Sequence, residues 1–265
     1  MSLHRRARPL LGTYVEIACR GDAQRCLPAI EAAFAAIARV HALMSAHEPR
    51  SDVSRMNERA QLEAVRVDAE THHVLEAALA LHAQSGGAFD VAAGSAGTSG
   101  DIRLLAQCRV RFARPMRVDL GGIAKGYAVD RAVAELAARG ITQAIVNAGG
   151  DLRVLGAEPQ PVHLRDPGRP SLLHPALALA SGAVATSAGY FTRAVVDPST
   201  GAACEDRGSA SVVAPTAMLA DALAKVVLLR GARARALLRR YDAHALVLRA
   251  ARGALHARWL PQAPA

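Results

Sequence analysis

Apolar and polar side chains alternate between Thr13 and Cys19, which is the pattern of a half-buried β-strand. Asp22 then precedes a long run in which apolar residues recur at steps of three and four, as in an amphipathic helix that buries one face. The residues of this face are Leu27, Ile30, Phe34, Ile37, Val40 and Met44. The pattern therefore predicts one long helix after Asp22, followed by a turn-rich stretch over residues 45–52.

Further helices and strands are predicted from similar patterns and their boundary residues. Helices are expected at residues 70–85, from the residue after Gly121 and Gly122 to Gly140, at residues 216–229 and around residues 232–241. Strands are expected at residues 144–147, 161–165, 177–186, 209–214 and 244–249, and residues 92–101 are expected to form a mobile loop. Because helices and strands do not alternate regularly, we expect an α+β fold in a single domain over residues 1–265.

Composition excludes several classes of protein. Hydrophobic residues make up 51% and charged residues 21% of the chain, which indicates a globular protein. The net charge of +9 comes from scattered arginines with only 3% aromatic residues, so we expect no nucleic-acid partner. Apolar stretches such as residues 176–185 are shorter than the roughly 20 residues of a membrane span, so none is expected.

The cysteines and the N-terminal residues bear on the cellular compartment. The four cysteines form no C-x-x-C pair and have no zinc-site spacing, so we expect reduced thiols. No apolar leader precedes the strand at Thr13. We therefore expect a cytoplasmic protein, or a periplasmic one if a leader has been removed.

The segment Val118–Asp130, which reads VDLGGIAKGYAVD, carries the clearest chemical signal. Asp119, two glycines and a helix start with Lys125 in its first turn can bind phosphate, because glycine lets the backbone approach and the helix end is positive. The segment matches neither of the nucleotide-binding fingerprints G-x-G-x-x-G and G-x-x-x-x-G-K-[ST]. From these residues alone, a ligand site and a tightly capped helix start explain the pattern equally well.

Lysine is scarce in this chain: Lys125 and Lys225 are the only two among 32 basic residues. Where arginine fills nearly every basic position, a remaining lysine indicates a site that needs a compact ammonium. Lys225 follows Asp221 by four residues, so both side chains share one face of the expected helix. An ordinary surface ion pair is the alternative explanation.

Three more segments combine glycine with a carboxylate, namely residues 86–90 (GGAFD), 147–151 (NAGGD) and 197–201 (DPSTG). Each is by itself an ordinary turn sequence. The sequence contains no G-x-S-x-G or H-E-x-x-H motif, so it gives no sign of the common hydrolase or metalloprotease sites.

Together and in this order, these segments resemble the ApbE family of FAD:protein FMN transferases. The resemblance extends over most of the chain. The matching segments are residues 8–13 (RPLLGT), 43–45 (LMS), 51–57 (SDVSRMN), 87–90 (GAFD), 119–126 (DLGGIAKG), 147–151 (NAGGD), 197–201 (DPSTG), 211–216 (SVVAPT) and 220–223 (ADAL).

The resemblance implies an α+β fold, with mixed or antiparallel sheets packed against helices, and a Mg²⁺-assisted reaction. In this reaction the FMN part of FAD is transferred to a Thr or Ser of a target flavoprotein, and AMP is released. By similarity, the flavin-nucleotide contacts are Met44, Ala88, Phe89, Asp90, Asp119, Lys125 and Val195. The carbonyl of Gly122 and the carboxylate of Asp221 are implied metal ligands, hard oxygens that suit Mg²⁺.

The chain departs from the family pattern at the implied metal site. A threonine that would give the metal a further oxygen usually stands where this chain has Lys225. A protonated ammonium has no lone pair and cannot act as a ligand. We therefore expect the Lys225 ammonium to lie beside Asp221 and partly to substitute for the cation or to compete with it.

A second departure concerns the proton acceptor. The family usually carries a histidine three residues before the Asp-Pro-x-Thr-Gly turn, where it is a candidate general base, and this chain has Ala194 there. Loss of one base typically costs about 10²–10⁴ in rate. Tyr190, Asp197 and His47 are candidates to replace it. The stretches 90–119 and 190–197 are also shorter than is usual in the family.

Three functions therefore remain open at the level of sequence. The first is the FMN transferase, the second an impaired FAD-binding protein, and the third a pyrophosphatase that splits FAD into FMN and AMP. Asp119, Lys125 and Asp221 suit all three, whereas Ala194 and Lys225 favour the binding protein. AMP release would separate the two enzymes from the binding protein, and dependence on an acceptor would separate the enzymes from each other.

Overall fold

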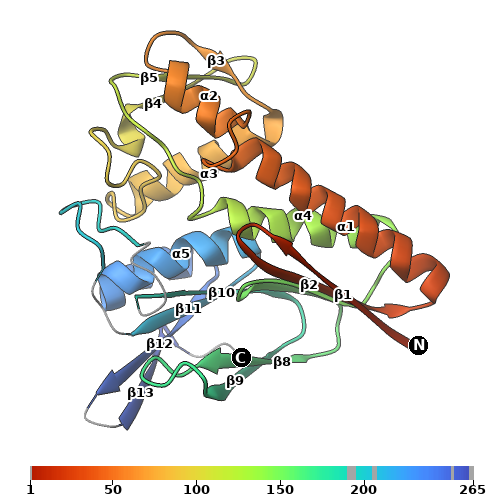
Figure 1. Cartoon of the computed structure of the whole chain (residues 1–265). Coiled ribbons are helices and arrows are strands. Elements are labelled where there is room, and N and C mark those ends of the chain that lie inside the picture. Colours follow the sequence, from red (N-terminus) through yellow and green to blue (C-terminus); the bar gives the residue numbers. More distant parts are fainter. Residues whose placement is uncertain (1, 190–194, 205–207, 252–253, 263–265) are drawn as a thin grey trace.

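A computed structural model describes residues 2–189, 195–204, 208–251 and 254–262, and its centre is an eight-stranded sheet (Figure 1). The strands of this sheet are β1 (Ser2–Leu10), β2 (Thr13–Gly21), β6 (Ala144–Ala148), β7 (Asp151–Leu155), β10 (Gly182–Ala188), β11 (Ser209–Ala214), β12 (His244–Ala251) and β13 (Ala254–Leu260). Their order is β1-β2-β6-β7-β10-β11-β12-β13, and each neighbouring pair is antiparallel.

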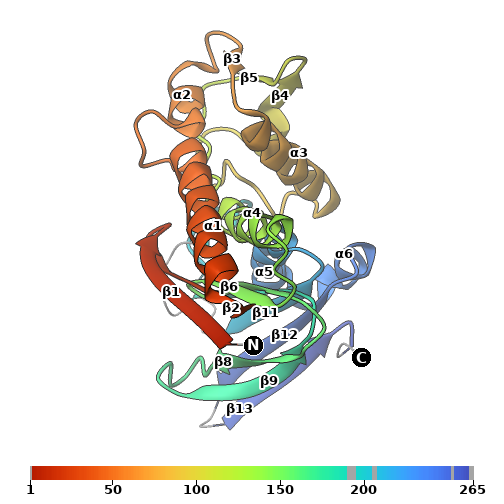
Figure 2. The same ribbon diagram turned by 90° about the vertical axis from the view of Figure 1, so that its right-hand side faces the viewer.

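Three helices cover one face of the sheet: α1 (Ala23–Met44), α4 (Ala124–Ala138) and α5 (Ala217–Arg230). α5 packs on β10 and β11, α4 packs beside it over β6 and β7, and α1 packs against α4 and β2 (Figures 1 and 2). Phe34, Leu136 and Leu223 are among the large side chains fully buried between these layers. This packing places the N-terminal turns of α4 and α5 close to the sheet and to each other.

The opposite face of the sheet is covered by a hairpin of β8 (Gln160–Arg165) and β9 (Leu173–Leu179), as Figure 2 shows. A second, smaller apolar cluster lies between the hairpin and the sheet. Its buried members are Val154, Val162, Leu164, Leu179, Val184, Leu246 and Leu248. The central sheet is therefore buried on both faces over its middle strands.

A further layer lies on the far side of α1 and α4 from the sheet (Figure 1). It contains α2 (Asp52–Arg59), α3 (Ala69–Gln84), the short helix η1 (Ser99–Asp101) and a small sheet of β3 (Val65–Arg66), β5 (Arg109–Phe112) and β4 (Ile102–Leu105). Asp52 is buried and accepts hydrogen bonds from Thr71 Oγ1 at 2.6 Å and from the backbone N–H of Asp68 at 2.8 Å. The segment around Asp52 thus ties α2 to α3.

The α+β class predicted from the sequence is confirmed, as are the helices α1, α3, α4 and α5 within a few residues at each end. The helix expected around residues 232–241 consists of η2 (Gly231–Ala234) and α6 (Arg235–Arg240). The single strand expected at residues 177–186 is wrong. The chain turns before Gly182, which adopts φ +114°, so that β9 pairs with β8 while β10 joins the central sheet.

The loop at residues 92–101, expected to be mobile, is held by the side chain of Asp90. Asp90 Oδ1 accepts hydrogen bonds from the N–H of Ala92 at 2.8 Å and from Ser99, through its N–H at 2.9 Å and its Oγ at 2.7 Å. The end of this loop forms η1, capped by Thr98 and Asp101. The Gly/Ser/Ala composition therefore does not make this loop unstructured, because a buried carboxylate organises it.

Helix α1 has the length and hydropathy of a membrane span, which corrects the expectation that every apolar stretch is too short. One face of this helix is nevertheless part of the main apolar cluster of the protein. Its buried residues include Ile30, Phe34, Ile37 and Val40. This burial is typical of the core helix of a globular protein.

Candidate functional site

Two lysines and two aspartates meet where the N-terminal turn of α4, the start of β7 and the middle of α5 converge. Lys125 Nζ lies 3.0 Å from Asp151 Oδ2. Lys225 Nζ donates hydrogen bonds to Asp221 Oδ1 and, at 3.0 Å, to the backbone oxygen of the same residue. We call these four residues the four-charge cluster.

The carboxylates of the cluster are buried and its ammonium groups are partly exposed. The side chains of Asp151 and Asp221 are each 2% exposed, whereas those of Lys125 and Lys225 are 29% and 22% exposed. The carboxylates are therefore the buried members of the cluster, and the lysine side chains are its partly exposed members. An anionic ligand that reached the cluster would meet the lysine side chains first.

The four charges act on one another's protonation. Burial, together with the neighbouring Asp221 carboxylate, raises the pKa of Asp151 to about 7 against the opposing effect of the two lysines. Burial on its own would lower the pKa of Lys125, but the carboxylates of Asp151 and Asp221 outweigh it and raise that pKa. Lys125 is consequently a permanent cation at neutral pH.

The first turn of α4 and the turn that precedes it already donate hydrogen bonds to carboxylates of the protein itself. The backbone N–H of Gly126 donates to Asp221 Oδ2 at 3.1 Å, and that of Gly121 donates to Asp119 Oδ1 at 2.7 Å. The expectation that amides of this turn are free for phosphate is therefore wrong for these two groups. The positive end of α4 stabilises the Asp221 carboxylate instead.

Asp130 fixes the start of α5, and sequence reasoning did not identify it as a site residue. Its carboxylate accepts hydrogen bonds from the N–H of Ala217 at 2.8 Å and of Met218 at 2.9 Å, and from Arg153 at 2.6 Å. It thus caps α5 from the neighbouring helix and sets the position of Asp221 one turn later. The sequence does offer one sign of its importance, because Asp130 is the last residue of the segment Val118–Asp130.

The start of β7 is shaped by two glycines with positive φ, Gly149 at +63° and Gly150 at +103°. A Cβ at Gly149 would lie 2.5 Å from Thr13 Oγ1, so the family segments at residues 8–13 and 147–151 meet here. Asn147 Oδ1 accepts a hydrogen bond from the N–H of Gly150 at 2.9 Å. This tight turn directs Asp151 toward Lys125, a pairing that the sequence did not reveal.

Gly122 and Asp119, both expected at the site, lie in the turn that precedes α4, and Gly122 contacts the cluster. A Cβ at Gly122 would lie 3.2 Å from Lys225 Cε and 3.6 Å from Phe89 Cε2, so the lysine stem packs directly on this glycine. The backbone N–H of Asp119 donates to the carbonyl of Val91 at 2.8 Å, and the residue is exposed. Its carboxylate can therefore accept hydrogen bonds from a ligand.

The other expected flavin contacts are mostly packed into the protein. Met44, Ala88 and Phe89 are 2%, 2% and 4% exposed and belong to the main apolar cluster. Asp90 is committed to its own loop. Val195 is partly buried, and its carbonyl accepts a hydrogen bond from the N–H of Cys204 at 2.7 Å. Of these residues, Phe89 approaches the four-charge cluster, through Gly122.

The candidates for a proton acceptor differ in their positions. Ala194 and Tyr190 lie outside the described residues. His47 is exposed in the turn after α1. Asp197 begins a turn in which Gly201 N–H donates to its backbone oxygen at 2.8 Å, and hydrogen bonds from Ser199 hold the pKa of its carboxyl below the usual range. A lowered pKa makes Asp197 a weak base.

The residues at Asp221 do not fit a divalent cation. Two oxygens of Asp221 accept hydrogen bonds from Lys225, and its third accepts one from Gly126. Where the family has a threonine oxygen, this chain places an ammonium. Within the described part of the chain, no group of three His, Cys, Asp or Glu residues could hold a metal ion. The Lys225 ammonium occupies the oxygens that a metal ion would use and has no lone pair to offer as a ligand, which is unfavourable for Mg²⁺.

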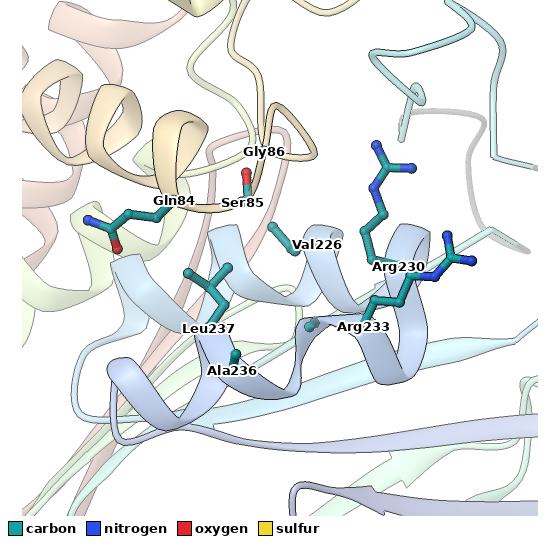
Figure 3. A pocket seen from close by; sticks show the side chains of 9 residues that line it. Gln84, Ser85, Gly86, Val226, Arg230, Arg233, Ala236 and Leu237 are labelled. Atoms are coloured by element: carbon teal, nitrogen blue, oxygen red, sulfur yellow. The ribbon is translucent and has the colours of Figure 1, made fainter.

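A cleft of about 330 Å³ lies beyond Lys225 along α5 (Figure 3). It is bounded by the end of α3 at Ser85 and Gly86, by Val226 and Arg230 of α5, and by Arg233. Figure 3 shows the two arginine side chains extending toward the same end of the cleft. None of the four-charge cluster lines the cleft, so we treat it as a neighbouring surface feature and not as the centre of the site.

Comparison with known proteins places this fold and this set of segments in a family. Residues 11–99 and 97–248 match the ApbE family. An FAD:protein FMN transferase from Treponema pallidum (strain Nichols) is 28% identical, with 85% of this chain and 78% of that protein aligned. Another from Rhodobacter capsulatus is 35% identical, with 46% of this chain aligned to 26% of that protein, so the match spans about a quarter of the length of that relative.

Solved structures agree with the family match. The ApbE protein from Thermotoga maritima has a TM-score of 0.85 and 27% identity, with 98% of this chain and 97% of that chain covered. The flavin transferase ApbE from Vibrio cholerae also has a TM-score of 0.85, over 98% of this chain and 97% of its own, and at 21% identity it supports the fold alone. Because the family match extends over most of the sequence, the chain belongs to the ApbE family.

Proposed function

We propose that this protein transfers the FMN part of FAD to a Thr or Ser of a target flavoprotein and releases AMP. Its family membership supports this proposal, because relatives are named FAD:protein FMN transferases. The observation that carries it in this chain is the four-charge cluster, which presents two ammonium groups beside the glycine turn at residues 121–122. A pyrophosphate is the part of FAD that would match this positive charge.

The reaction forms one P–O bond and breaks another. The hydroxyl oxygen of the acceptor attacks the phosphorus of the FMN half, the bond from that phosphorus to the AMP phosphate oxygen breaks, and the hydroxyl proton is released. Such transfers depend mainly on positioning and on neutralising charge on the phosphoryl oxygens. Lys125 and Lys225 would supply this neutralisation, and Asp119 would orient the nucleotide through hydrogen bonds to its carboxylate.

This chain has Ala194 where the family usually has a histidine base. Phosphoryl transfer requires little covalent chemistry from the protein, so the loss of this base is tolerable. A reaction driven by charge and position can continue after loss of a histidine base, although more slowly. The Mg²⁺ that the resemblance implies has no support from the residues at Asp221. FAD is the donor substrate of the proposed reaction, and the flavoprotein with its Thr or Ser is the partner.

In-gel flavin fluorescence tests the proposal. The purified protein is incubated with FAD and with a flavoprotein domain that carries an acceptor threonine, both with Mg²⁺ and with EDTA, and AMP is quantified in the same samples. We expect a fluorescent acceptor band and an equal amount of AMP. The matched control is the acceptor with its threonine replaced by valine, which should give no band.

Other results would contradict the transferase. FAD retained by the protein without any band or AMP would indicate a binding protein. Release of FMN and AMP at the same rate with and without acceptor would indicate a pyrophosphatase.

A further inference from the structure

The Lys225 ammonium lies next to the buried carboxylate of Asp221 and balances its negative charge. Asp151 and Asp221 are both buried, and apart from Lys225 the cationic side chain of the cluster is Lys125. Lys125 is the ion-pair partner of Asp151, and Lys225 is the ion-pair partner of Asp221. Removing Lys225 would leave the buried Asp221 carboxylate without this partner, which is costly in an interior of low polarity.

The position of the Lys225 ammonium is fixed by more than one contact. It donates to Asp221 Oδ1 and, at 3.0 Å, to the backbone oxygen of Asp221. Its stem is held against Gly122, where a Cβ would lie 3.2 Å from Cε and 3.3 Å from Cδ. A side chain at Gly122 would therefore push the lysine away, and the absence of one creates the space that the stem fills.

The ammonium retains capacity for a ligand. It has three N–H donors, two of which go to Asp221. The Lys225 side chain is 22% exposed and that of Asp221 is 2% exposed, so the lysine is the more accessible member of the pair. This places a fixed positive charge with a donor at the surface of the site.

We propose that Lys225 is a built-in cation that takes the place of a divalent metal ion at Asp221, so that this chain works without Mg²⁺. This inference rests on the proposed function for its catalytic consequence: the Lys225 ammonium neutralises the pyrophosphate of FAD during FMN transfer. Its structural consequence is independent of the reaction. Mg²⁺ has no site at Asp221 while Lys225 is present, and replacing Lys225 by an oxygen-bearing residue creates one.

The test compares thermal unfolding in EDTA and in Mg²⁺ for the full-length protein and for Lys225→Thr. We expect the wild-type melting temperature to be the same in both. Lys225→Thr should melt at a lower temperature in EDTA and recover by roughly 5 °C at a Mg²⁺ concentration about one hundred times its Kd. Lys225→Met keeps most of the length of the stem but offers neither charge nor oxygen. Its melting temperature should also be lower than that of the wild type, and Mg²⁺ should raise it less than it raises that of Lys225→Thr.

A matched control is Arg139→Thr. Arg139 pairs with Glu135 four residues earlier on α4, as Lys225 pairs with Asp221 on α5, but its side chain is 42% exposed. Its replacement should leave unfolding independent of Mg²⁺. A Mg²⁺-dependent shift as large as that of Lys225→Thr would show that any broken lysine or arginine pair responds in this way and would overturn the assignment.

Flavin transfer provides the second readout. The ratio of the transfer rate in Mg²⁺ to that in EDTA should be near one for the wild type and at least tenfold for Lys225→Thr. A wild-type enzyme that loses transfer in EDTA, or whose melting temperature rises with Mg²⁺ as much as that of the variant, overturns the inference. Calorimetric titration of the wild type with Mg²⁺ in the presence of FAD checks the same point without any variant, because heat beyond that of Mg²⁺ titrated into FAD alone would contradict it.

These readouts separate the inference from the function on which it rests. If no protein shows transfer under any condition, the proposed function fails, while the unfolding and calorimetric comparisons still decide whether Lys225 occupies the metal position. If transfer occurs in the wild type only with Mg²⁺, the function stands and the inference fails.

Discussion

Replacing Gly126 by alanine tests whether the close approach of α4 and α5 positions the site. Gly126 is buried in α4, and a Cβ there would lie 2.1 Å from the backbone oxygen of Ala217 and 2.8 Å from the N–H nitrogen of Met218. Both contacts are with backbone, so no side chain can rotate away. The two helices must separate by roughly an ångström, which also lengthens the hydrogen bond from Gly126 to Asp221.

The net cost of Gly126→Ala can be worked from three contributions. Alanine is favoured over glycine in a helix by about 1 kcal/mol. Overpacking costs about 1–3 kcal/mol, and a weakened hydrogen bond to a buried charged group costs up to about 1.5–3 kcal/mol. We expect the free energy of unfolding to fall by about 2–4 kcal/mol, and the melting temperature by roughly 5–15 °C.

Urea unfolding followed by circular dichroism measures this change. Ala134→Gly on the exposed side of α4 is the control, and should cost about 1 kcal/mol from helix propensity alone. A Gly126→Ala protein as stable as the wild type, or more stable, would refute the argument that α4 and α5 are in backbone contact here.

Three further outcomes follow from individual buried groups. Asp130→Ala removes the acceptor for the first turn of α5 and should lower the free energy of unfolding by about 2–3 kcal/mol in urea, whereas an unchanged midpoint would contradict its capping role. Burial raises the pKa of Asp151 to about 7, so the folded protein holds a proton that the unfolded chain has released above a pH of about 4. Raising the pH from about 4 to 7 should therefore lower the free energy of unfolding by up to about 4 kcal/mol, and Asp151→Asn should flatten this part of the profile in chemical denaturation. Burial also raises the pKa of Cys19 to about 12, so a thiol reagent at mildly alkaline pH should label the partly exposed Cys108 and Cys204 in the native protein and spare Cys19 until urea is added.

The helices could be predicted from the sequence because their signals are local. Asp22 accepts a hydrogen bond from the N–H of Gln24, Thr216 accepts one from Leu219, and Gly140 ends α4 with φ +73°. Apolar residues at helical spacing between such boundaries gave the helix positions. The single domain over residues 1–265 and the cytoplasmic location stay predictions.

Two of the elements that were missed, β1 and α2, lack a local hydrophobic period. β1 is almost wholly exposed and shows no alternation, and it is a strand because it pairs along its length with β2. α2 is only eight residues long and buries Asp52, Val53 and Met56, too few apolar positions for a helical period. Pairing with another strand in the case of β1, and packing against other elements in the case of α2, decide these segments, and not their own local pattern.

The site also contains one pairing that could be predicted from the sequence and one that could not. The pairing of Asp221 with Lys225 follows from a spacing of four on one helix, and it was predicted. The pairing of Lys125 with Asp151 joins a helix to a strand 26 positions away, and it depends on the turn at residues 149–150 and on the packing of α4 over β7. The sequence alone does not show that Lys125 and Asp151 are brought together by these features.

The arginine-rich strand β1 bears on how the protein avoids self-association. A strand at the border of a sheet offers unpaired backbone groups to any other extended chain. In the described part of the chain β1 forms this border, and it carries Arg5, Arg6, Arg8 and Pro9 on an exposed surface. Arg8 also bonds to Glu31 and lies over the ring of Phe34 at 4.5 Å, which secures the strand to α1. Repulsion between two such borders would oppose aggregation, so part of the positive charge of this protein serves its solubility and not its chemistry.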